Sequence, residues 1–218
     1  MPIDFELARH TMVEQQVRPW EVLDPRVLSV LATLKREDFV PPRHRRLAFT
    51  DIALPLEHGE VMMKPVVEGR LLQALELSPE DEVLEIGTGS GFLTACLAQL
   101  ARDVLSIDIH ADFVERARGR LAATGLSNVR IETADALSFA SERRFDAVAV
   151  TGAVTTLPTG FLAWLKPGGR LFVVRGHAPA QEAVLLRQNG GILAAPESLF
   201  ETDIPYLRGA APAERFAL

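Results

Sequence analysis

Three glycines follow directly on an apolar segment that has the composition of a buried strand. The strand covers residues 82–86, the glycines are Gly87, Gly89 and Gly91, and an apolar helical pattern comes next. Glycine permits a tight strand-to-helix turn and a close approach of a ligand to the backbone, and the N–H groups of the helix start point at that ligand. Residues 85–91 therefore form a candidate cofactor loop.

The residues around the glycines distinguish between kinds of nucleotide-binding loop. The dinucleotide fingerprint G-x-G-x-x-G needs a small residue at position 92, where this sequence has Phe92. The phosphate-binding P-loop needs Gly-Lys-Ser or Gly-Lys-Thr, and neither follows these glycines. A pyrophosphate cradle and a P-loop are both disfavoured, which leaves another nucleoside cofactor or a glycine-rich turn without a ligand.

Two aspartates follow the next two predicted strands. Asp108 comes about 20 residues after the glycines, a position from which a carboxylate can accept hydrogen bonds from both ribose hydroxyls. Asp135 is placed to accept a hydrogen bond from an adenine amino group, and Ala134 and Ala136 leave room for the ring. Either aspartate alone could be a helix cap or a surface charge, but together with the loop they favour a bound nucleoside.

The composition restricts the classes of partner. Of the 218 residues, 48% are hydrophobic and 24% are charged, which is ordinary for a globular protein. The net charge of −6 argues against a nucleic-acid binder, because such proteins neutralise phosphates with clustered lysine and arginine. No run approaches the roughly 18 consecutive apolar residues of a membrane span. With the lone Cys96 excluding an intrachain disulfide, a cytoplasmic protein without nucleic-acid or membrane partners is expected.

Apolar periodicity predicts the elements that must position these residues. Helices are expected over 5–17 and 24–34, the second with Asp24 as its N-cap, and a proline-rich ordered loop over 39–65. Further on, helices and short apolar runs alternate, which predicts right-handed crossovers and a mostly parallel sheet. The later helices are expected over 66–75, 91–101, 111–124 and 157–165, and the strands over 82–86, 104–107, 129–133, 145–151 and 170–175. Residues 1–65 are expected to pack on a main domain of residues 66–218 as one structural unit.

The C-terminal part departs from this alternation. Segments 183–187 and 192–195 flank Asn189, Gly190 and Gly191, which together are a strong hairpin signal. A parallel sheet that finishes with a hairpin gains an antiparallel strand. Such an ending is unusual for nucleotide-binding Rossmann domains and usual for methyltransferases.

Several ordered motifs resemble those of a known family. The sequence is similar to the class I methyltransferases in VLEIGTGSG at 83–91, FDAV at 145–148 and LKPGGRL at 165–171. More narrowly, it resembles the protein-L-isoaspartate O-methyltransferases in MVEQQ at 12–16, DPRVL at 24–28, REDFVP at 36–41, AF at 48–49, LP at 54–55 and IPYL at 204–207. The resemblance spans residues 12 to 209 and covers nearly the whole chain.

The resemblance implies a fold, a cofactor and a reaction. The fold would be a doubly wound α/β structure whose mostly parallel seven-stranded sheet ends in an antiparallel hairpin and carries an N-terminal helical extension. The cofactor would be S-adenosylmethionine, and the partner a peptide or protein that carries isoaspartate. Because the accepting carboxylate is already ionised at pH 7, alignment and desolvation can account for catalysis. The predicted cofactor-binding residues are Glu85, Gly87, Thr88, Gly89, Gly91, Asp108, Asp135 and Ala136.

The substrate loop departs from the pattern of the family. The family has Gly-Gln-Thr-Ile-Ser-x-Pro, whereas this chain has GEVMMKP at 59–65. Met63 therefore stands at the catalytic position where relatives present a hydroxyl, and Glu60 and Val61 replace Gln and Thr. The other predicted substrate-loop residues are His58, Gly59, Met62 and Lys64. The two methionines could form a wall over the methionine part of the cofactor or pack into the core, and Lys64 could attract a carboxylate or simply be exposed.

The altered loop leaves other functions open. One is methyl transfer to a different acceptor, and another is binding of S-adenosylmethionine without transfer. A nicotinamide-dependent oxidoreductase would share the sheet but not the loop, because of Phe92. The histidines show no metal-ligand spacing with one another or with Cys96, so no metal is predicted. Both a monomer and a homodimer are compatible with the sequence.

Overall fold

Seven strands lie side by side in one mixed sheet in the computed structural model, which describes residues 3–189 and 192–213. In chain order they are β3 (Glu82–Ile86), β4 (Asp103–Asp108), β5 (Val129–Thr133), β6 (Phe145–Val154), β7 (Leu165–His177), β8 (Ala180–Asn189) and β10 (Glu197–Thr202). The spatial order is β10-β8-β7-β6-β3-β4-β5. Strands β7, β6, β3, β4 and β5 are parallel, whereas β8 and β10 are antiparallel to their neighbours. This arrangement confirms the predicted sheet.

The order of the strands fixes where a ligand can bind. Strand β3 lies in the middle of the sheet, and β4 and β5 follow it on one side. The chain then crosses to the other side of β3, where β6 and β7 lie. The crossing makes a switch point between β3 and β6. In open α/β sheets, ligands bind beyond the carboxyl ends of the strands at such a point.

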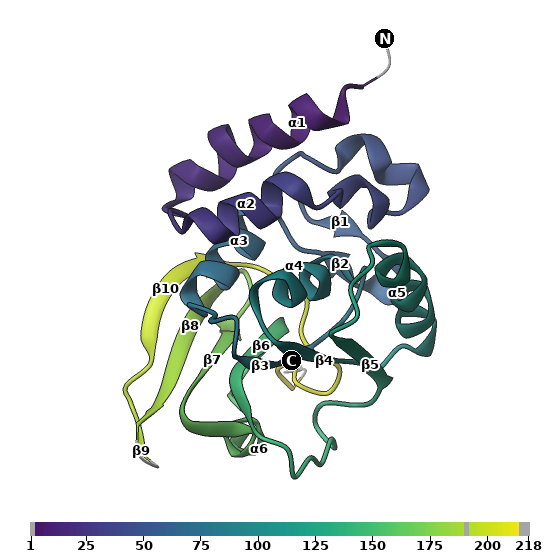
Figure 1. Cartoon of the computed structure of the whole chain (residues 1–218). Coiled ribbons are helices and arrows are strands. Elements are labelled where there is room, and N and C mark those ends of the chain that lie inside the picture. Colours follow the sequence, from purple (N-terminus) through teal and green to yellow (C-terminus); the bar gives the residue numbers. More distant parts are fainter. Residues whose placement is uncertain (1–2, 190–191, 214–218) are drawn as a thin grey trace, which may run out of the picture.

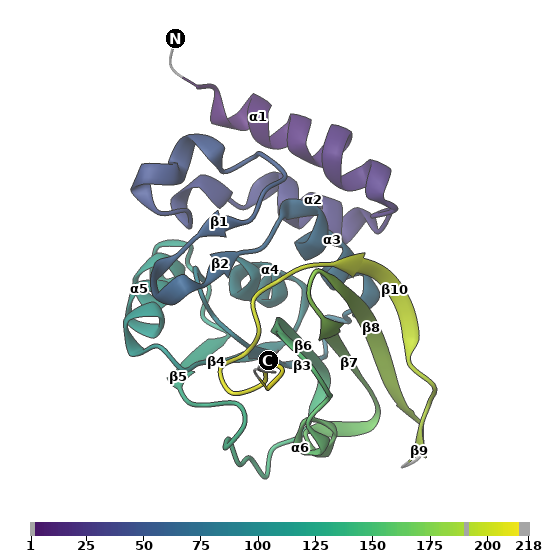
Figure 2. The same ribbon diagram turned by 180° about the vertical axis from the view of Figure 1, so that it is seen from behind.

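Helices cover both faces of the sheet (Figures 1 and 2). On one face lie α3 (Pro65–Ala74), α4 (Phe92–Leu100) and α5 (Ala111–Ala123), and on the other lies α6 (Thr159–Ala163). Successive side chains of a strand point to opposite faces of the sheet, so alternate residues pack on each of the two helical layers. Val83 packs in the cluster on the α4 face, and Leu84 packs in the cluster that contains Phe161 and Trp164.

An N-terminal helical layer stacks outside α4 (Figure 1). It contains α1 (Phe5–Met12), which continues through a π-helical turn (Val13–Val17) and a 3-10 turn (Arg18–Trp20), and α2 (Pro25–Thr33). Both predicted helices are confirmed, and the side chain of Asp24 caps α2 by accepting a hydrogen bond from the amide of Arg26. Met12 and Leu31 share one buried cluster with Leu71. Within the described residues, no helix has the length and apolar character needed to cross a membrane.

The proline-rich segment before α3 is ordered, as predicted, and has local structure of its own. It contains the two-stranded ribbon of β1 (Leu54–Pro55) and β2 (Val61–Met62) and 3-10 turns over Pro42–Leu47 and Glu57–Gly59, and a further 3-10 turn over Arg36–Asp38 precedes it. The ribbon lies next to α5 in both views (Figures 1 and 2). The substrate loop is therefore carried on a hairpin that faces the cofactor side of the sheet.

The C-terminal part differs in detail from the prediction. The helix expected over 157–165 is shorter, and β7 begins at Leu165 instead of 170 because Leu165 already pairs with Phe145 of β6. Residues 190 and 191 of the predicted turn lie outside the described residues. Their flanks pair antiparallel, Asn189 with Ile192 of β9 (Ile192–Leu193), so the predicted hairpin is confirmed.

Candidate active site

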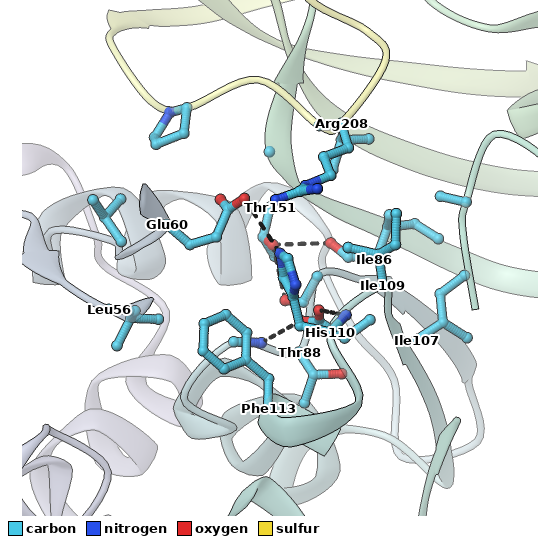
Figure 3. A pocket seen from close by; sticks show the side chains of 18 of the residues that line it. Leu56, Glu60, Ile86, Thr88, Ile107, Ile109, His110, Phe113, Thr151 and Arg208 are labelled. Carbon is cyan, nitrogen blue, oxygen red and sulfur yellow. Dashed lines mark hydrogen bonds and ion pairs between the residues drawn. The ribbon is translucent and has the colours of Figure 1, made fainter. Parts of the chain in front are cut away.

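Segments that are far apart in the sequence line one pocket at the carboxyl ends of the parallel strands (Figure 3). The lining residues are 56, 60–63, 68, 86–90, 93, 107–110, 113, 134–137, 151–152 and 205–208. The cofactor loop, the ends of β4, β5 and β6, the substrate loop and a C-terminal segment all contribute. The pocket therefore lies at the switch point that the topology indicates.

The structure brings most of the predicted site residues into this pocket, but not all of them. Those that line it are Gly87, Thr88, Gly89, Asp108, Asp135, Ala136, Met62 and Met63. Those outside the lining are Glu85, Gly91, His58, Gly59 and Lys64. Lining residues that were not predicted as site residues include Ile109, His110, Thr151 and Arg208, and also Tyr206 of the IPYL motif.

Asp108 at the end of β4 connects the cofactor loop to the strand that follows it. Its Oδ2 accepts a hydrogen bond from the amide of Gly89 at 2.8 Å, and its Oδ1 accepts one from the amide of His110 at 2.9 Å. The carboxylate is buried apart from 6% of the residue surface. Each carboxylate oxygen keeps a second acceptor position. Asp108 can therefore hold the loop and accept hydrogen bonds from a ribose diol at the same time.

The segment after β5 forms the rim of the pocket. Asp135 is exposed, and its Oδ1 accepts a hydrogen bond from the amide of Leu137 at 2.9 Å. Ala134 and Ala136 are half-buried beside it, and Ile109 presents an apolar side chain that is 39% exposed. A carboxylate beside small and aliphatic side chains suits a flat ring with an exocyclic amino group. The donors and acceptors present thus fit an adenosine.

Two glycines of the loop are required by packing. Gly87 has φ +93°, and an added Cβ would clash with Oγ1 of Thr151. That hydroxyl lies 2.9 Å from both carbonyl oxygens at Ile86 and Gly87, so it fastens the loop to β6. Gly91 has φ +85°, and an added Cβ would meet Cβ of Ala117 at 3.0 Å. Gly91 therefore lets α4 approach α5 and does not contact the pocket.

Glu85 points away from the pocket, toward the α4 face of the sheet. The residue is fully buried, and its Oε2 accepts hydrogen bonds from the hydroxyls of Thr94 at 2.5 Å and Ser106 at 2.6 Å. The side chain alternates with those of Leu84 and Ile86, which face the opposite cluster. Glu85 therefore lies outside the pocket lining and binds to α4 and β4, and its predicted contact with the cofactor stays a prediction.

The buried carboxyl of Glu85 should make stability depend on pH. Burial raises its pKa from 4.5 to about 8, although the hydrogen bonds from Ser106 and Thr94 lower it. Between pH 4.5 and about pH 8 the carboxyl group stays protonated in the folded chain but is ionised in the unfolded chain. The free energy of unfolding therefore falls as the pH rises through this interval. We expect Glu85→Gln to remove this contribution to the pH dependence of the free energy of unfolding. The stability of the variant should therefore rise relative to that of the wild type as the pH increases.

Urea denaturation of both proteins at about pH 6 and about pH 9 measures the effect as a change in the difference between their free energies of unfolding. Glu80→Gln, at an exposed glutamate, is the matched control and should leave the slope unchanged. A constant difference between Glu85→Gln and the wild type across this range would show that the Glu85 carboxyl ionises normally.

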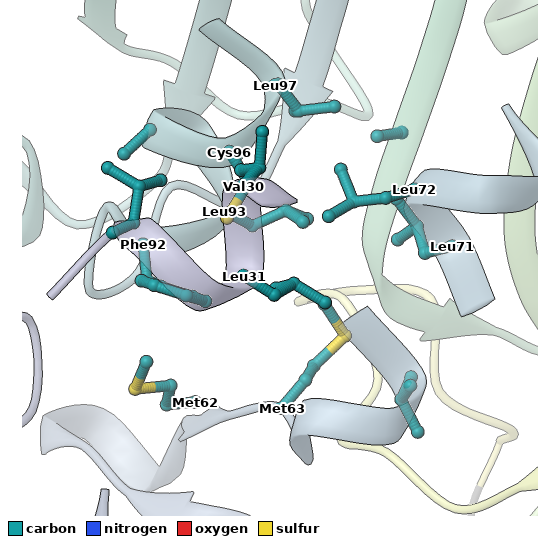
Figure 4. Close-up of a cluster of buried hydrophobic side chains, with 14 of the residues drawn as sticks. Val30, Leu31, Met62, Met63, Leu71, Leu72, Phe92, Leu93, Cys96 and Leu97 are labelled. Carbon is teal, nitrogen blue, oxygen red and sulfur yellow. The ribbon is translucent and has the colours of Figure 1, made fainter. Parts of the chain in front are cut away.

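Met62 and Met63 are both core residues and pocket residues. Their exposed fractions are 3% and 6%, and both belong to the buried cluster that contains Leu31 and Phe92 (Figure 4). Both also line the pocket. The interpretation that the methionines pack into the core is confirmed, and the same side chains form an apolar part of the pocket wall.

A buried ion pair fixes the substrate loop against α3. Nε and Nη2 of Arg36 donate hydrogen bonds to the carbonyl oxygens of Ala48 and Met63, each at 2.8 Å, and Nη1 pairs with Glu68. The guanidinium also lies 4.7 Å from the ring centroid of Phe92. Glu68 lines the pocket, and burial raises its pKa to about 7 against the opposing effect of Arg36.

The C-terminal segment closes one side of the pocket. It is held to β6 by hydrogen bonds from the amide of Ala153 to the carbonyl of Pro205 and from the amide of Leu207 to the carbonyl of Ala153, both at 2.8 Å. The hydroxyl of Tyr206 donates to the carbonyl of Gly176 at 3.0 Å. The segment is thereby fixed across the strand ends. The motif IPYL at 204–207 was the one sequence signal for it.

Arg208 extends from this segment into the mouth of the pocket. The residue is exposed, and Figure 3 shows its guanidinium directed toward Glu60 of the substrate loop. A cation at the mouth can attract an anionic acceptor. No local pattern in the sequence marks Arg208, because its position depends on how the C-terminal segment packs.

The fold and the pocket define a class of enzyme. A parallel sheet with antiparallel C-terminal strands, a glycine loop after its central strand and an aspartate at the end of the next strand make this a class I methyltransferase that uses S-adenosylmethionine. The family model of protein-L-isoaspartate(D-aspartate) O-methyltransferase (PCMT) matches residues 8–198. The chain therefore belongs to the protein-L-isoaspartate(D-aspartate) O-methyltransferase family.

Named relatives and solved structures agree with this assignment. The chain is 35% identical to a protein-L-isoaspartate O-methyltransferase of Koribacter versatilis over 87% of this chain and 86% of that protein. It is 42% identical to protein-L-isoaspartate O-methyltransferase 1 of Anaeromyxobacter sp. over 75% and 78% of the two chains. A crystal structure from Plasmodium falciparum, described as a beta-aspartate methyltransferase in complex with S-adenosyl-L-homocysteine, superposes with a TM-score of 0.79 at 18% identity, covering 91% of this chain and 97% of that one. This structural likeness supports the fold.

Proposed function

We propose that this chain transfers the methyl group of S-adenosylmethionine to the free carboxylate of isoaspartyl residues in a peptide or protein. One observation carries the proposal: residues 60–63 of the substrate loop and residues 86–90 of the cofactor loop line the same pocket. An acceptor held by one loop would therefore meet a cofactor held by the other. When bound, the cofactor would supply a methyl group on a sulfonium, from which the neutral thioether of S-adenosylhomocysteine is a good leaving group.

The residues of the pocket can provide binding, orientation and exclusion of water. Asp108 and Asp135 would hold the adenosine, and Met62 and Met63 would keep water from the reacting atoms. The acceptor carboxylate is ionised at neutral pH, so the site needs no general base. Arg208, the exposed cation at the pocket mouth, would attract and orient that carboxylate.

Arg208→Ala is expected to weaken acceptor binding selectively. Loss of an exposed ion pair costs about 1 kcal/mol, which corresponds to about a fivefold rise in KM for an isoaspartyl peptide. The Kd for S-adenosylhomocysteine should stay the same. Arg208→Lys keeps the charge and should recover part of the loss, and Arg130→Ala, at an exposed arginine on β5, is the matched control. An unchanged KM in Arg208→Ala would remove this residue from acceptor binding.

Incubation with methyl-labelled S-adenosylmethionine tests the reaction itself. An isoaspartyl peptide and its aspartyl twin are compared, and base-labile methyl ester is counted after S-adenosylhomocysteine binding has been confirmed by calorimetry. We expect label on the isoaspartyl peptide alone. Absence of label on both peptides would mean that the methyl group goes to another acceptor. The apolar Met63 and the acidic Glu60 of the substrate loop would then select that acceptor. If the isoaspartyl peptide is labelled only by the Met63→Ser variant, the altered substrate loop is the reason why the wild type does not methylate it.

The location of the reaction is a separate part of the proposal. We infer a cytoplasmic enzyme without nucleic-acid partners from the lone buried Cys96 and the net charge of −6. Cell fractionation with an antibody against the chain tests this location directly.

A further inference from the structure

Three potential metal ligands meet beside the pocket. His58 lies in the 3-10 turn of the substrate loop, His110 precedes α5, and Asp112 lies in the first turn of α5. One ligand atom from each of the three lies within 4.8 Å of the other two. His58 and Asp112 are 54 positions apart in the sequence, yet Nε2 of His58 lies 3.0 Å from Oδ1 of Asp112. The sequence predicted no metal because this proximity is created by the fold.

The imidazole of His110 has one unsatisfied nitrogen, Nε2. Its side chain is only 10% exposed, and its Nε2 is buried without a hydrogen-bond partner among the described residues. The nearest carboxylate oxygen, Oε1 of Glu60, is 3.8 Å away, which is too long for a hydrogen bond. Buried polar atoms nearly always have a partner, so an orphan of this kind indicates a missing ligand.

We propose that His58, His110 and Asp112 form a site for a divalent transition-metal ion of the zinc class. Imidazole nitrogens with one carboxylate suit Zn²⁺, Cu²⁺ and Ni²⁺, whereas Mg²⁺ and Ca²⁺ need oxygen ligands throughout. The two rings are stacked, with centroids 4.0 Å apart and planes at 4°. One ring must tilt before both lone pairs converge on an ion. His58 can tilt because its side chain is 38% exposed on a surface turn.

Occupation of this site would connect two parts of the pocket. His58 belongs to the substrate loop, whereas His110 and Asp112 are fixed to β4 and α5, directly after Asp108. The ion would therefore clamp the substrate loop onto the cofactor side. This property is independent of methyl transfer, so it can be tested whatever acceptor the enzyme uses.

Titration of the chelator-treated full chain with Zn²⁺, followed by calorimetry, tests the site. We expect one Zn²⁺ per chain and weak or undetectable binding of Mg²⁺. His58→Ala and Asp112→Asn should each weaken Zn²⁺ binding by at least about tenfold, since even outer-shell changes commonly cost that much. His177→Ala, at an exposed histidine at the carboxyl end of β7 and outside the three-residue cluster, is the matched control and should bind as the wild type does.

Two results would overturn the assignment. One is wild-type affinity for Zn²⁺ in His58→Ala with its circular dichroism unchanged, and the other is Mg²⁺ binding as tight as Zn²⁺ binding. The clamp has its own readout, because Zn²⁺ should slow amide hydrogen exchange over residues 57–60 in the wild type but not in His58→Ala. Zn²⁺ binding with unchanged exchange in this segment would refute the clamp.

Discussion

Asp108→Ala is expected to weaken binding of S-adenosylhomocysteine by at least about a hundredfold. A hydrogen bond to a charged group contributes about 1.5–3 kcal/mol, and two such bonds from a ribose diol give at least two factors of ten in Kd. The substitution also removes the acceptors of the Gly89 and His110 amides, so the cofactor loop loses its attachment to β4. Isothermal titration calorimetry with S-adenosylhomocysteine measures the effect.

Controls separate loss of binding from loss of fold. Asp203→Asn, at an exposed aspartate outside the pocket lining, should keep the wild-type Kd. Asp108→Asn keeps one carbonyl acceptor and should lie between Asp108→Ala and the wild type. Thermal melts without ligand show whether each variant is folded at the temperature of the titration. A Kd for Asp108→Ala within a few-fold of the wild type would mean that Asp108 does not contact the cofactor.

Arg36→Met is expected to reduce the free energy of unfolding by about 3–5 kcal/mol. Removing one partner of a buried ion pair leaves the other buried without compensation, and losses of this size are typical. Here the loss has a second part, because the guanidinium also satisfies the carbonyl oxygens of Ala48 and Met63. Denaturation in urea measures the change. Arg46→Met, at an exposed arginine, is the control variant in the same experiment.

A double-mutant cycle distinguishes the two contributions. Glu68→Gln should cost less than Arg36→Met, because burial already raises the pKa of Glu68 to about 7 and the neutral side chain stays close in shape. The double variant should remain less stable than Glu68→Gln, since the two carbonyl groups stay unsatisfied. Equal stability of the double variant and Glu68→Gln would show that the ion pair accounts for the whole role of Arg36.

The sequence by itself determined the elements and the centre of the cofactor site. Strand β3 and strand β5 have the predicted bounds, and Asp24 caps α2 as predicted, because apolar period and capping depend on neighbours along the chain. Asp108 could be placed in the pocket because all parallel strands end at one edge of the sheet. The resemblance to the family could be found in the sequence because each of its motifs is a stretch of consecutive residues.

Only the tertiary structure decided which charged and polar groups meet. The sequence marked Glu85 only as a residue of the cofactor motif, and the structure shows that the hydroxyls of Thr94 and Ser106 donate hydrogen bonds to its carboxyl group. The Arg36 to Glu68 pair, Arg208 at the pocket mouth and the stacked His58 and His110 join residues that no local pattern relates. Their partners depend on burial and on contacts between distant segments, which arise only when the N-terminal layer, the sheet and the C-terminal segment pack together.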